Sequence, residues 1–184
     1  MEREGMNIVS SLTLAELLGV TAAQIRKDFS YFGGFGKQGT GYQIFFLVDA
    51  LQRILKIDRI WKVALVGLGD LGNALIRYQG FATHGFEIVL AFDNDPLKVG
   101  AHIGLVQTQH IDSLEAALES LDVKIALLTV SATEAQAVTD RLIAGGVKAI
   151  LNYAPVTLII PGDVQVLNVD PIHYLQQMTY YLAD

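Results

Sequence analysis

The chain has 184 residues, of which 52% are hydrophobic and 17% charged, and it contains no cysteine. This composition excludes an intrinsically disordered chain and excludes disulfide or thiolate chemistry, and it fits a cytoplasmic location without a membrane-spanning or signal segment. The net charge is −6, but residues 1–60 hold seven basic against six acidic side chains whereas residues 61–184 hold six against thirteen, so we expect a polyanion to meet the N-terminal part.

Residues 11–31 have the pattern of two short helices joined by a tight turn. Leucines recur at helical spacing over residues 14–18, Gly19 ends the first pattern, and Thr21 can cap a second helix over residues 22–31. Two helices joined by a short glycine-containing turn predict a helix-turn-helix motif.

The second of these helices has two chemically different faces. Ile25 and Phe29 lie one turn apart and are expected to face inward. The opposite face carries the candidates for DNA contact, which are Arg26, Lys27, Ser30 and Tyr31. Arginine is the usual bidentate partner of guanine, and lysine, serine and tyrosine suit phosphates. A solvated helix face of mixed charge is the alternative interpretation.

The next segment is rich in glycine, with five glycines between residues 33 and 41. It predicts a β-hairpin wing with Lys37 and Gln38 near its tip, where Lys37 would reach the DNA. A third helix is expected from about residue 45 to 55. The sequence thus predicts a winged helix-turn-helix domain over residues 1–60.

From residue 61 onward the pattern changes to alternating strands and helices. Residues 62–66 form a continuous apolar strand of the kind buried in a parallel sheet. Further strands are expected at 87–92, 124–129, 148–152 and 164–169, and helices at 70–78, 113–120, 133–144 and 172–182. Such alternation predicts βαβ units and a doubly wound α/β fold.

A glycine pattern typical of dinucleotide binding follows the first of these strands and opens a helix. Its six residues are Gly67, Leu68, Gly69, Asp70, Leu71 and Gly72. The first glycine allows the tight turn, the second allows a pyrophosphate to approach, and the third allows the helix to pack on the strand. The helix N-terminus offers free N–H groups to the phosphates. Residues 61–184 are therefore predicted to be a Rossmann-type NAD(H)-binding domain.

The second strand ends in Asp93, close to the spacing expected of the acid that binds the adenine ribose hydroxyls. A carboxylate at this place would repel a 2′-phosphate, so NAD(H) is favoured over NADP(H). The alternative is structural, because residues 93–96 are rich in turn formers and can cap a helix.

Two later strand ends are candidates for the nicotinamide pocket, because ligands bind at the carboxyl ends of strands in open α/β sheets. The candidate residues are Thr129 and Val130 after one strand and Asn152, Ala154 and Pro155 after the next. A dry pocket lined by Val130, Ala154 and Pro155 would penalise the charged ring of NAD⁺ relative to NADH. The alternative is ordinary strand-to-loop structure.

The sequence gives no sign of a catalytic or metal site. None of His84, His102, His110 and His173 lies beside the strand ends, and no cluster has metal-ligand spacing. Cofactor binding without visible chemistry indicates a sensor, not an enzyme. A small NAD-dependent oxidoreductase and a CoA-binding Rossmann module remain as alternatives, since the cofactor fingerprints overlap.

The whole chain from about Ser10 resembles one family, the redox-sensing transcriptional repressors called Rex. The resemblance rests on five stretches in the family's order, at residues 20–33 with 39–42, 66–72, 92–96, 127–130 and 150–155. It implies a homodimer that exchanges its C-terminal helix at about 172–182 and represses respiratory and fermentative genes until NADH binds. It also places residues 26, 27, 30 and 31 on operator DNA.

The resemblance implies a switch and shows one departure. Tyr78 and Asp170 match positions that relay the cofactor's state to the DNA-binding region. The family has a full helix before the helix-turn-helix, with an arginine that pairs across the dimer with the residue matching Asp170. Far fewer residues precede Ser10 here, and Arg3 is not a convincing substitute, so the first helix is expected to be absent.

Overall fold

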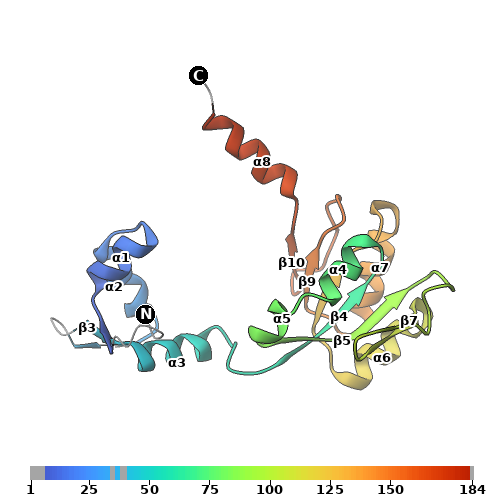
Figure 1. Cartoon of the computed structure of the whole chain (residues 1–184), viewed down its shortest axis with the longest axis horizontal. Coiled ribbons are helices and arrows are strands. Elements are labelled where there is room, and N and C mark those ends of the chain that lie inside the picture. The colour runs from blue at the N-terminus through green and yellow to red at the C-terminus, as the bar shows by residue number, and fades with distance from the viewer. Residues whose placement is uncertain (1–6, 34–35, 38–40, 183–184) are drawn as a thin grey trace. The chain divides into compact units, whose positions relative to one another are not determined.

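The computed structural model describes residues 7–33, 36–37 and 41–182. The chain divides into two compact units, residues 1–59 and residues 60–184, and each is described by itself (Figure 1). Arg3 and the expected absence of a first helix concern a segment that lies largely outside the described residues. No helix in the described ranges is both long and apolar enough to span a membrane.

The first unit combines three helices with a small antiparallel sheet. Its elements are β1 (Ile8–Val9), α1 (Ser11–Leu18), α2 (Ala22–Tyr31), β2 (Gly36–Lys37), β3 (Gly41–Gln43) and α3 (Ile44–Ile54), with strand order β1-β3-β2. Ser10 and Thr21 cap α1 and α2 by accepting hydrogen bonds from the backbone N–H groups of Thr13 and Gln24. Helix-turn-helix and hairpin therefore form a winged helix, with β1 as a strand that the sequence pattern did not predict.

A small core holds this unit together. Val9, Ile44 and Leu47 are buried, and the rings of Phe29 and Tyr42 meet edge to face with centroids 5.0 Å apart. The contact joins α2 to β3, so the helix and the hairpin are fixed to each other. Gln38 lies outside the described residues, and Lys37 is described only as part of β2.

The second unit is a doubly wound sheet of seven strands in the order β10-β9-β8-β4-β5-β7-β6 (Figure 1). The strands are β4 (Trp61–Val66), β5 (Phe86–Asp93), β6 (His102–Ile103), β7 (Val106–His110), β8 (Ile125–Leu128), β9 (Ala149–Asn152) and β10 (Gln165–Asn168). All neighbours are parallel except β6, which pairs antiparallel with β7. The chain starts at β4, adds β5 on one side and β8 on the other, and so creates a topological switch point where ligands bind in such folds.

Alternate residues of β4 supply the two cores on opposite faces of the sheet. Ala64 and Val66 pack in the core that contains α6 (Leu114–Leu121) and α7 (Ala132–Ala144). Val63 and Leu65 pack in the core that receives α4 (Asp70–Ile76) and α5 (Gly80–Thr83). Each face of the sheet is therefore covered by helices, as the continuous apolar strands require.

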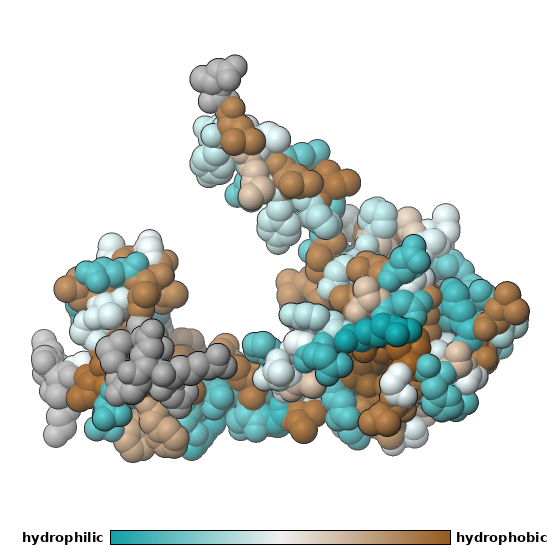
Figure 2. Space-filling view, viewed as in Figure 1, coloured by the Kyte–Doolittle hydropathy of each residue, from teal (hydrophilic) through white to brown (hydrophobic). Residues whose placement is uncertain are grey.

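The last helix, α8 (Pro171–Tyr180), differs from the others because every one of its residues is exposed. Asp170 caps it by accepting a hydrogen bond from the N–H of Ile172, and Pro171 occupies its first position. Figure 2 shows apolar side chains along this helix at the surface. The observed bounds are close to the predicted 172–182.

Candidate functional site

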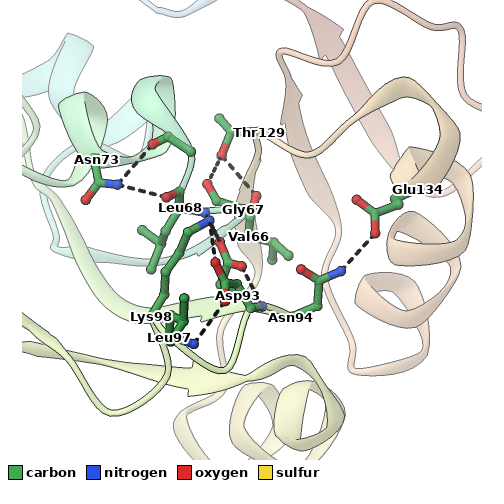
Figure 3. A network of polar contacts seen from close by, with 12 residues as sticks. Val66, Gly67, Leu68, Asn73, Asp93, Asn94, Leu97, Lys98, Thr129 and Glu134 are labelled. Atoms are coloured by element: carbon green, nitrogen blue, oxygen red, sulfur yellow. Dashed lines mark hydrogen bonds and ion pairs between the residues drawn. The ribbon is translucent and has the colours of Figure 1, made fainter.

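The glycine turn after β4 lies so close to the segment after β8 that its first residue must be glycine. Gly67 has φ +96°, and a Cβ there would lie 2.7 Å from the carbonyl oxygen of Thr129 and 2.9 Å from Cγ1 of Val130. The hydroxyl of Thr129 donates to the carbonyl oxygens of Val66 at 3.0 Å and of Gly67 at 2.6 Å (Figure 3). The end of β8 thus holds the turn in place from the side.

The other two glycines of the turn have different tasks. A Cβ on Gly72 would lie 2.0 Å from the carbonyl oxygen of Gly67, so α4 packs directly on the turn. Among the described residues, a Cβ on Gly69 would meet nothing within 4 Å, and no side chain caps the helix that Gly69 begins. The space in front of Gly69 and the first N–H groups of α4 are therefore free for an anionic group.

Asp93 lies at the end of β5 and is bound to the glycine turn. One carboxylate oxygen accepts from the N–H of Leu68 at 2.7 Å and from Nζ of Lys98 at 3.1 Å, and the other accepts from the N–H of Asp95 at 2.9 Å (Figure 3). Burial alone would raise the pKa of Asp93, but these hydrogen bonds and the charge of Lys98 hold it below its ordinary value. The side chain is therefore an anion at neutral pH.

A cavity of about 460 Å³ lies between the glycine turn, Asp93 and helix α7. Its volume is within the usual range of small-molecule sites. Asn94 donates to Glu134 of α7 at 2.9 Å (Figure 3). Ser131 donates to the other oxygen of that carboxylate, so hydrogen bonds close the wall from β5 to α7. The lining residues include Gly67, Gly69, Asp93, Asn94, Lys98, Ile111, Thr129, Val130, Val138 and Arg141.

Helix α2 of the first unit presents a polar surface opposite its buried side. Ile25 is buried, whereas Arg26, Lys27, Ser30 and Tyr31 are exposed, Tyr31 by 72%. Arg26 donates to the hydroxyl of Ser11 in α1 at 3.2 Å, and the hydroxyl of Ser30 donates to the carbonyl of Lys27. This face can offer two cations and a phenol to a polyanion.

Family comparisons find two domain matches. Residues 58–156 match the family described as "CoA binding domain", and residues 1–30 match the family described as "Putative DNA-binding protein N-terminus". The first match covers most of the Rossmann unit.

Curated relatives and solved structures align with almost the whole of this chain. It is 50% identical over 180 residues to the redox-sensing transcriptional repressor Rex of Chloroflexus aurantiacus, covering 98% of this chain and 85% of that protein. It is 46% identical over 181 residues to the Rex protein of a Roseiflexus species, and the match covers 98% of this chain and 82% of that protein. The chain belongs to the Rex family of redox-sensing transcriptional repressors.

The Rex fold is also seen in the solved structures that this chain resembles. A crystal structure of RSP in complex with β-NAD⁺ and operator DNA superposes with a TM-score of 0.94 at 35% identity, covering 98% of this chain and 83% of that one. A crystal structure of RSP in complex with β-NADH superposes with a TM-score of 0.88 at 33% identity. The match covers 98% of this chain and 84% of that one. The predicted winged helix with a Rossmann-type domain is confirmed.

The structure does not bring all the residues predicted for the Rex cofactor site together. Val130 lines the cavity at the glycine turn, whereas Ala154 and Pro155 line a second cavity of about 350 Å³ beside β9 and β10, together with Asp170 and His173. The residues of the expected dry pocket, Val130, Ala154 and Pro155, therefore line two separate cavities in this structure.

Asn152 has a local role that the sequence did not reveal. Its side chain is buried, donates to the carbonyl of Val156 at 3.0 Å and to Asn168 at 2.9 Å, and accepts from the N–H of Ala154 at 2.9 Å. Since both ends of the amide are engaged within the chain, Asn152 shapes the loop after β9 and has little left to offer a ligand.

The two residues implied as a switch are both accessible. Tyr78 follows α4, is exposed, and meets the ring of Phe81 edge to face at 5.4 Å. Asp170 is exposed at the start of α8. Sequence reasoning missed Lys98, Ile111 and Arg141 on the cavity wall, of which only Lys98 lies near a recognised motif.

Proposed function

We propose that this chain is a cytoplasmic, homodimeric repressor that binds operator DNA and leaves it when NADH binds in the Rossmann unit. The single observation that carries the proposal is the buried Asp93 on the glycine turn. It lies in a chain that aligns over nearly its full length with Rex repressors and with RSP bound to operator DNA. The relatives are named as repressors and not as enzymes.

In this proposal the cofactor binds along the cavity at the glycine turn. The free N–H groups of α4 would hold the pyrophosphate, and Asp93 would hold the ribose hydroxyls. An anion at that ribose repels a phosphate on it, which disfavours NADP(H) and also coenzyme A, whose ribose carries a phosphate. Lys98 reduces this repulsion because it is paired with Asp93 at 3.1 Å.

NADH and NAD⁺ differ by the charge of the nicotinamide ring, so the preference for NADH depends on where that ring lies. Placing a cation against apolar groups such as Val130 costs free energy unless an anion pairs with it. NADH can displace DNA only by binding the DNA-free form more tightly than the DNA-bound form. Tyr78 and Asp170 are the residues we propose for transmitting this difference.

The DNA-binding surface in this proposal consists of Arg26, Lys27, Ser30 and Tyr31 of α2 with Lys37 of the hairpin. Arg26→Ala is expected to weaken operator binding roughly tenfold to a hundredfold, the range for loss of one base contact. Arg53→Ala is the matched control, because Arg53 is exposed on α3 and pairs with Asp49. Equal losses for both variants would contradict the assignment of α2.

The deciding experiment is a gel shift at one fixed salt concentration, using operator DNA selected from a random duplex library. We expect binding without cofactor and with NAD⁺, and release with NADH. Calorimetric titrations with NADH, NAD⁺ and coenzyme A run in parallel. Release by neither dinucleotide would contradict the proposal, and tight binding of coenzyme A alone would favour a CoA-binding module.

A further inference from the structure

The last residues of the neighbouring strands β4, β8, β9 and β10 are joined side by side along the carboxyl edge of the sheet. On one side of β8, the hydroxyl of Thr129 donates to the carbonyl oxygen of Gly67 in the glycine turn. On the other side, Asn152 ends β9 in register with Leu128 of β8 and with Asn168 of β10. The glycine turn and the residues before α8 therefore belong to one continuous row of strand ends.

Asn152 is the buried member of this row and connects β9 to the segment that leads into α8. Its side chain is 1% exposed and donates from Nδ2 to Oδ1 of Asn168 at 2.9 Å. Its backbone carbonyl accepts from the N–H of Val169 at 2.8 Å. Asp170, the next residue, caps α8 through the N–H of Ile172. Two hydrogen bonds from one residue thus fix the chain immediately before the helix begins.

The same side chain holds the loop after β9. Asn152 donates to the carbonyl of Val156 and accepts from the N–H of Ala154. A second anchor comes from α7, where the amide of Gln136 donates to the carbonyl of Ile159 at 3.0 Å and accepts from its N–H at 2.9 Å. Because both N–H groups and the oxygen of the Asn152 amide are engaged, the loop and the start of α8 shift together unless a buried hydrogen bond breaks.

The elements that hold this loop also border the cavity at the glycine turn. Thr129 and Val130 at the end of β8 and Glu134 and Val138 of α7 line that cavity. A ligand in the cavity therefore touches the strand end beside Asn152 and the helix that anchors the loop. Hydrogen bonds connect both of these elements to the residues before α8.

We infer that Asn152 and Asn168 are positioning residues that fix how α8 leaves the sheet and couple this helix to the ligand state of the glycine-turn cavity. The inference rests on the proposed function, in which two copies exchange α8, so that the direction of its first turn sets how the copies hold each other. A ligand acts on that direction only by binding two arrangements of the strand ends with different affinity. A hydrogen-bonded row with two discrete arrangements can carry such a difference.

The first test measures amide hydrogen exchange at residues 169–174 without ligand, in the full chain and its variants. Asn168→Ala removes the acceptor for Asn152 at an exposed position, and exchange there is expected to be roughly fivefold faster, from loss of one hydrogen bond. Asn168→Asp keeps an oxygen at that place and should exchange like the unaltered protein. Gln165→Ala, exposed at the other end of β10, is the matched control and leaves the rate unchanged.

The second test adds NADH and operator DNA. We expect all variants to bind NADH within about twofold of the unaltered protein in titration calorimetry, because the described lining of the glycine-turn cavity includes no residue of β10. NADH changes the exchange rate at residues 169–174 in the unaltered protein and in Asn168→Asp, but not in Asn168→Ala. The ratio of operator affinities without and with NADH falls roughly fivefold in Asn168→Ala and is kept in Asn168→Asp.

The two tests separate this inference from the proposed function. Equal exchange at residues 169–174 in Asn168→Ala and the unaltered protein, or an NADH response that both share, overturns the inference. NADH that alters exchange at α8 in the unaltered protein but leaves operator binding as it was overturns the proposed function, and the coupling stands. Faster exchange in Asn168→Ala that extends to β8 indicates general destabilisation and counts against the inference, whereas an increase confined to residues 169–174 supports it.

Discussion

Asp93 was predictable as a residue, but its partners were not. Its distance from the glycines and its place at a strand end indicated a ribose ligand. The structure adds that the carboxylate also accepts from the N–H of Leu68, so the residue fixes the turn as well as facing the cavity. Lys98, five residues later, pairs with it through a loop whose course depends on packing and not on local sequence.

Asp70 is a residue whose charge opposes the proposed ligand. It is exposed at the first position of α4, directly after the turn that would hold the pyrophosphate. An anion there stabilises the helix by about 0.3–1 kcal/mol through its interaction with the helix dipole, but it repels a bound phosphate. We expect Asp70→Asn to bind NADH and NAD⁺ up to about fivefold more tightly, both to the same extent, at a small cost in stability.

The control for Asp70 removes one negative charge elsewhere. Glu119 is exposed on α6, and Glu119→Gln changes the net charge by the same amount as Asp70→Asn. Calorimetry at low and high salt checks the prediction, because a direct charge effect weakens with screening. An equal gain in both variants would assign the effect to net charge and not to the position of Asp70.

At the scale of elements, the sequence predicted the longer ones whose apolar residues follow a clear pattern and missed the short or mostly polar ones. Strands β4, β8 and β9 were expected because their residues are almost all apolar. Strand β7 reads Val-Gln-Thr-Gln-His and was missed, since it pairs beside β5 near the sheet edge and needs few apolar side chains. The short β1, β6 and α5 lack enough residues to show a period.

Only those cavity residues that belong to a local sequence pattern could be predicted. The glycine turn and Asp93 belong to one βαβ unit, whose local sequence carries its own pattern. Ile111 and Arg141 come from later elements that reach the cavity only after the sheet has formed. The orientation of Arg141 depends on Glu115, which lies 26 residues earlier on another helix, and no local pattern encodes that contact.

The glycine turn and α4 give a prediction about two glycines with different neighbours. Gly72→Ala would place a Cβ 2.0 Å from the carbonyl oxygen of Gly67, so the turn or the helix must shift. We expect a loss of about 1–3 kcal/mol in the free energy of unfolding of the Rossmann unit, together with loss of NADH binding. Urea unfolding and calorimetry measure the two effects.

Gly69→Ala is the matched substitution. Its Cβ meets nothing within 4 Å and its φ of −72° suits alanine, so the fold is expected to keep its stability. The added methyl group enters the space proposed for the pyrophosphate, and NADH affinity should fall while the unfolding curve stays unchanged. Intact NADH affinity in Gly69→Ala would remove the turn from the binding site.

At the scale of the whole molecule, α8 is a helix that buries none of its residues against the part of the chain that the structure describes. Ile172, Leu175 and Met178 follow one face at helical spacing, and each is at least 60% exposed. A helix of ten residues is marginal in water unless its apolar face is covered. The proposed homodimer supplies that cover by exchange of this helix between subunits.

Leu175→Glu tests this arrangement because it places a charge in the middle of the apolar stripe. We expect the variant to sediment as a monomer and to lose operator binding by more than tenfold, because the proposed dimer would hold two half-sites of the operator at once. NADH binding should persist, since the lining of the glycine-turn cavity contains no residue of α8. Gln176→Glu adds the same charge at the next residue, off the stripe, and should leave the dimer and DNA binding intact. An unaltered protein that sediments as a monomer and still binds operator, or a Leu175→Glu variant that stays dimeric, would show that the apolar stripe is covered in some other way.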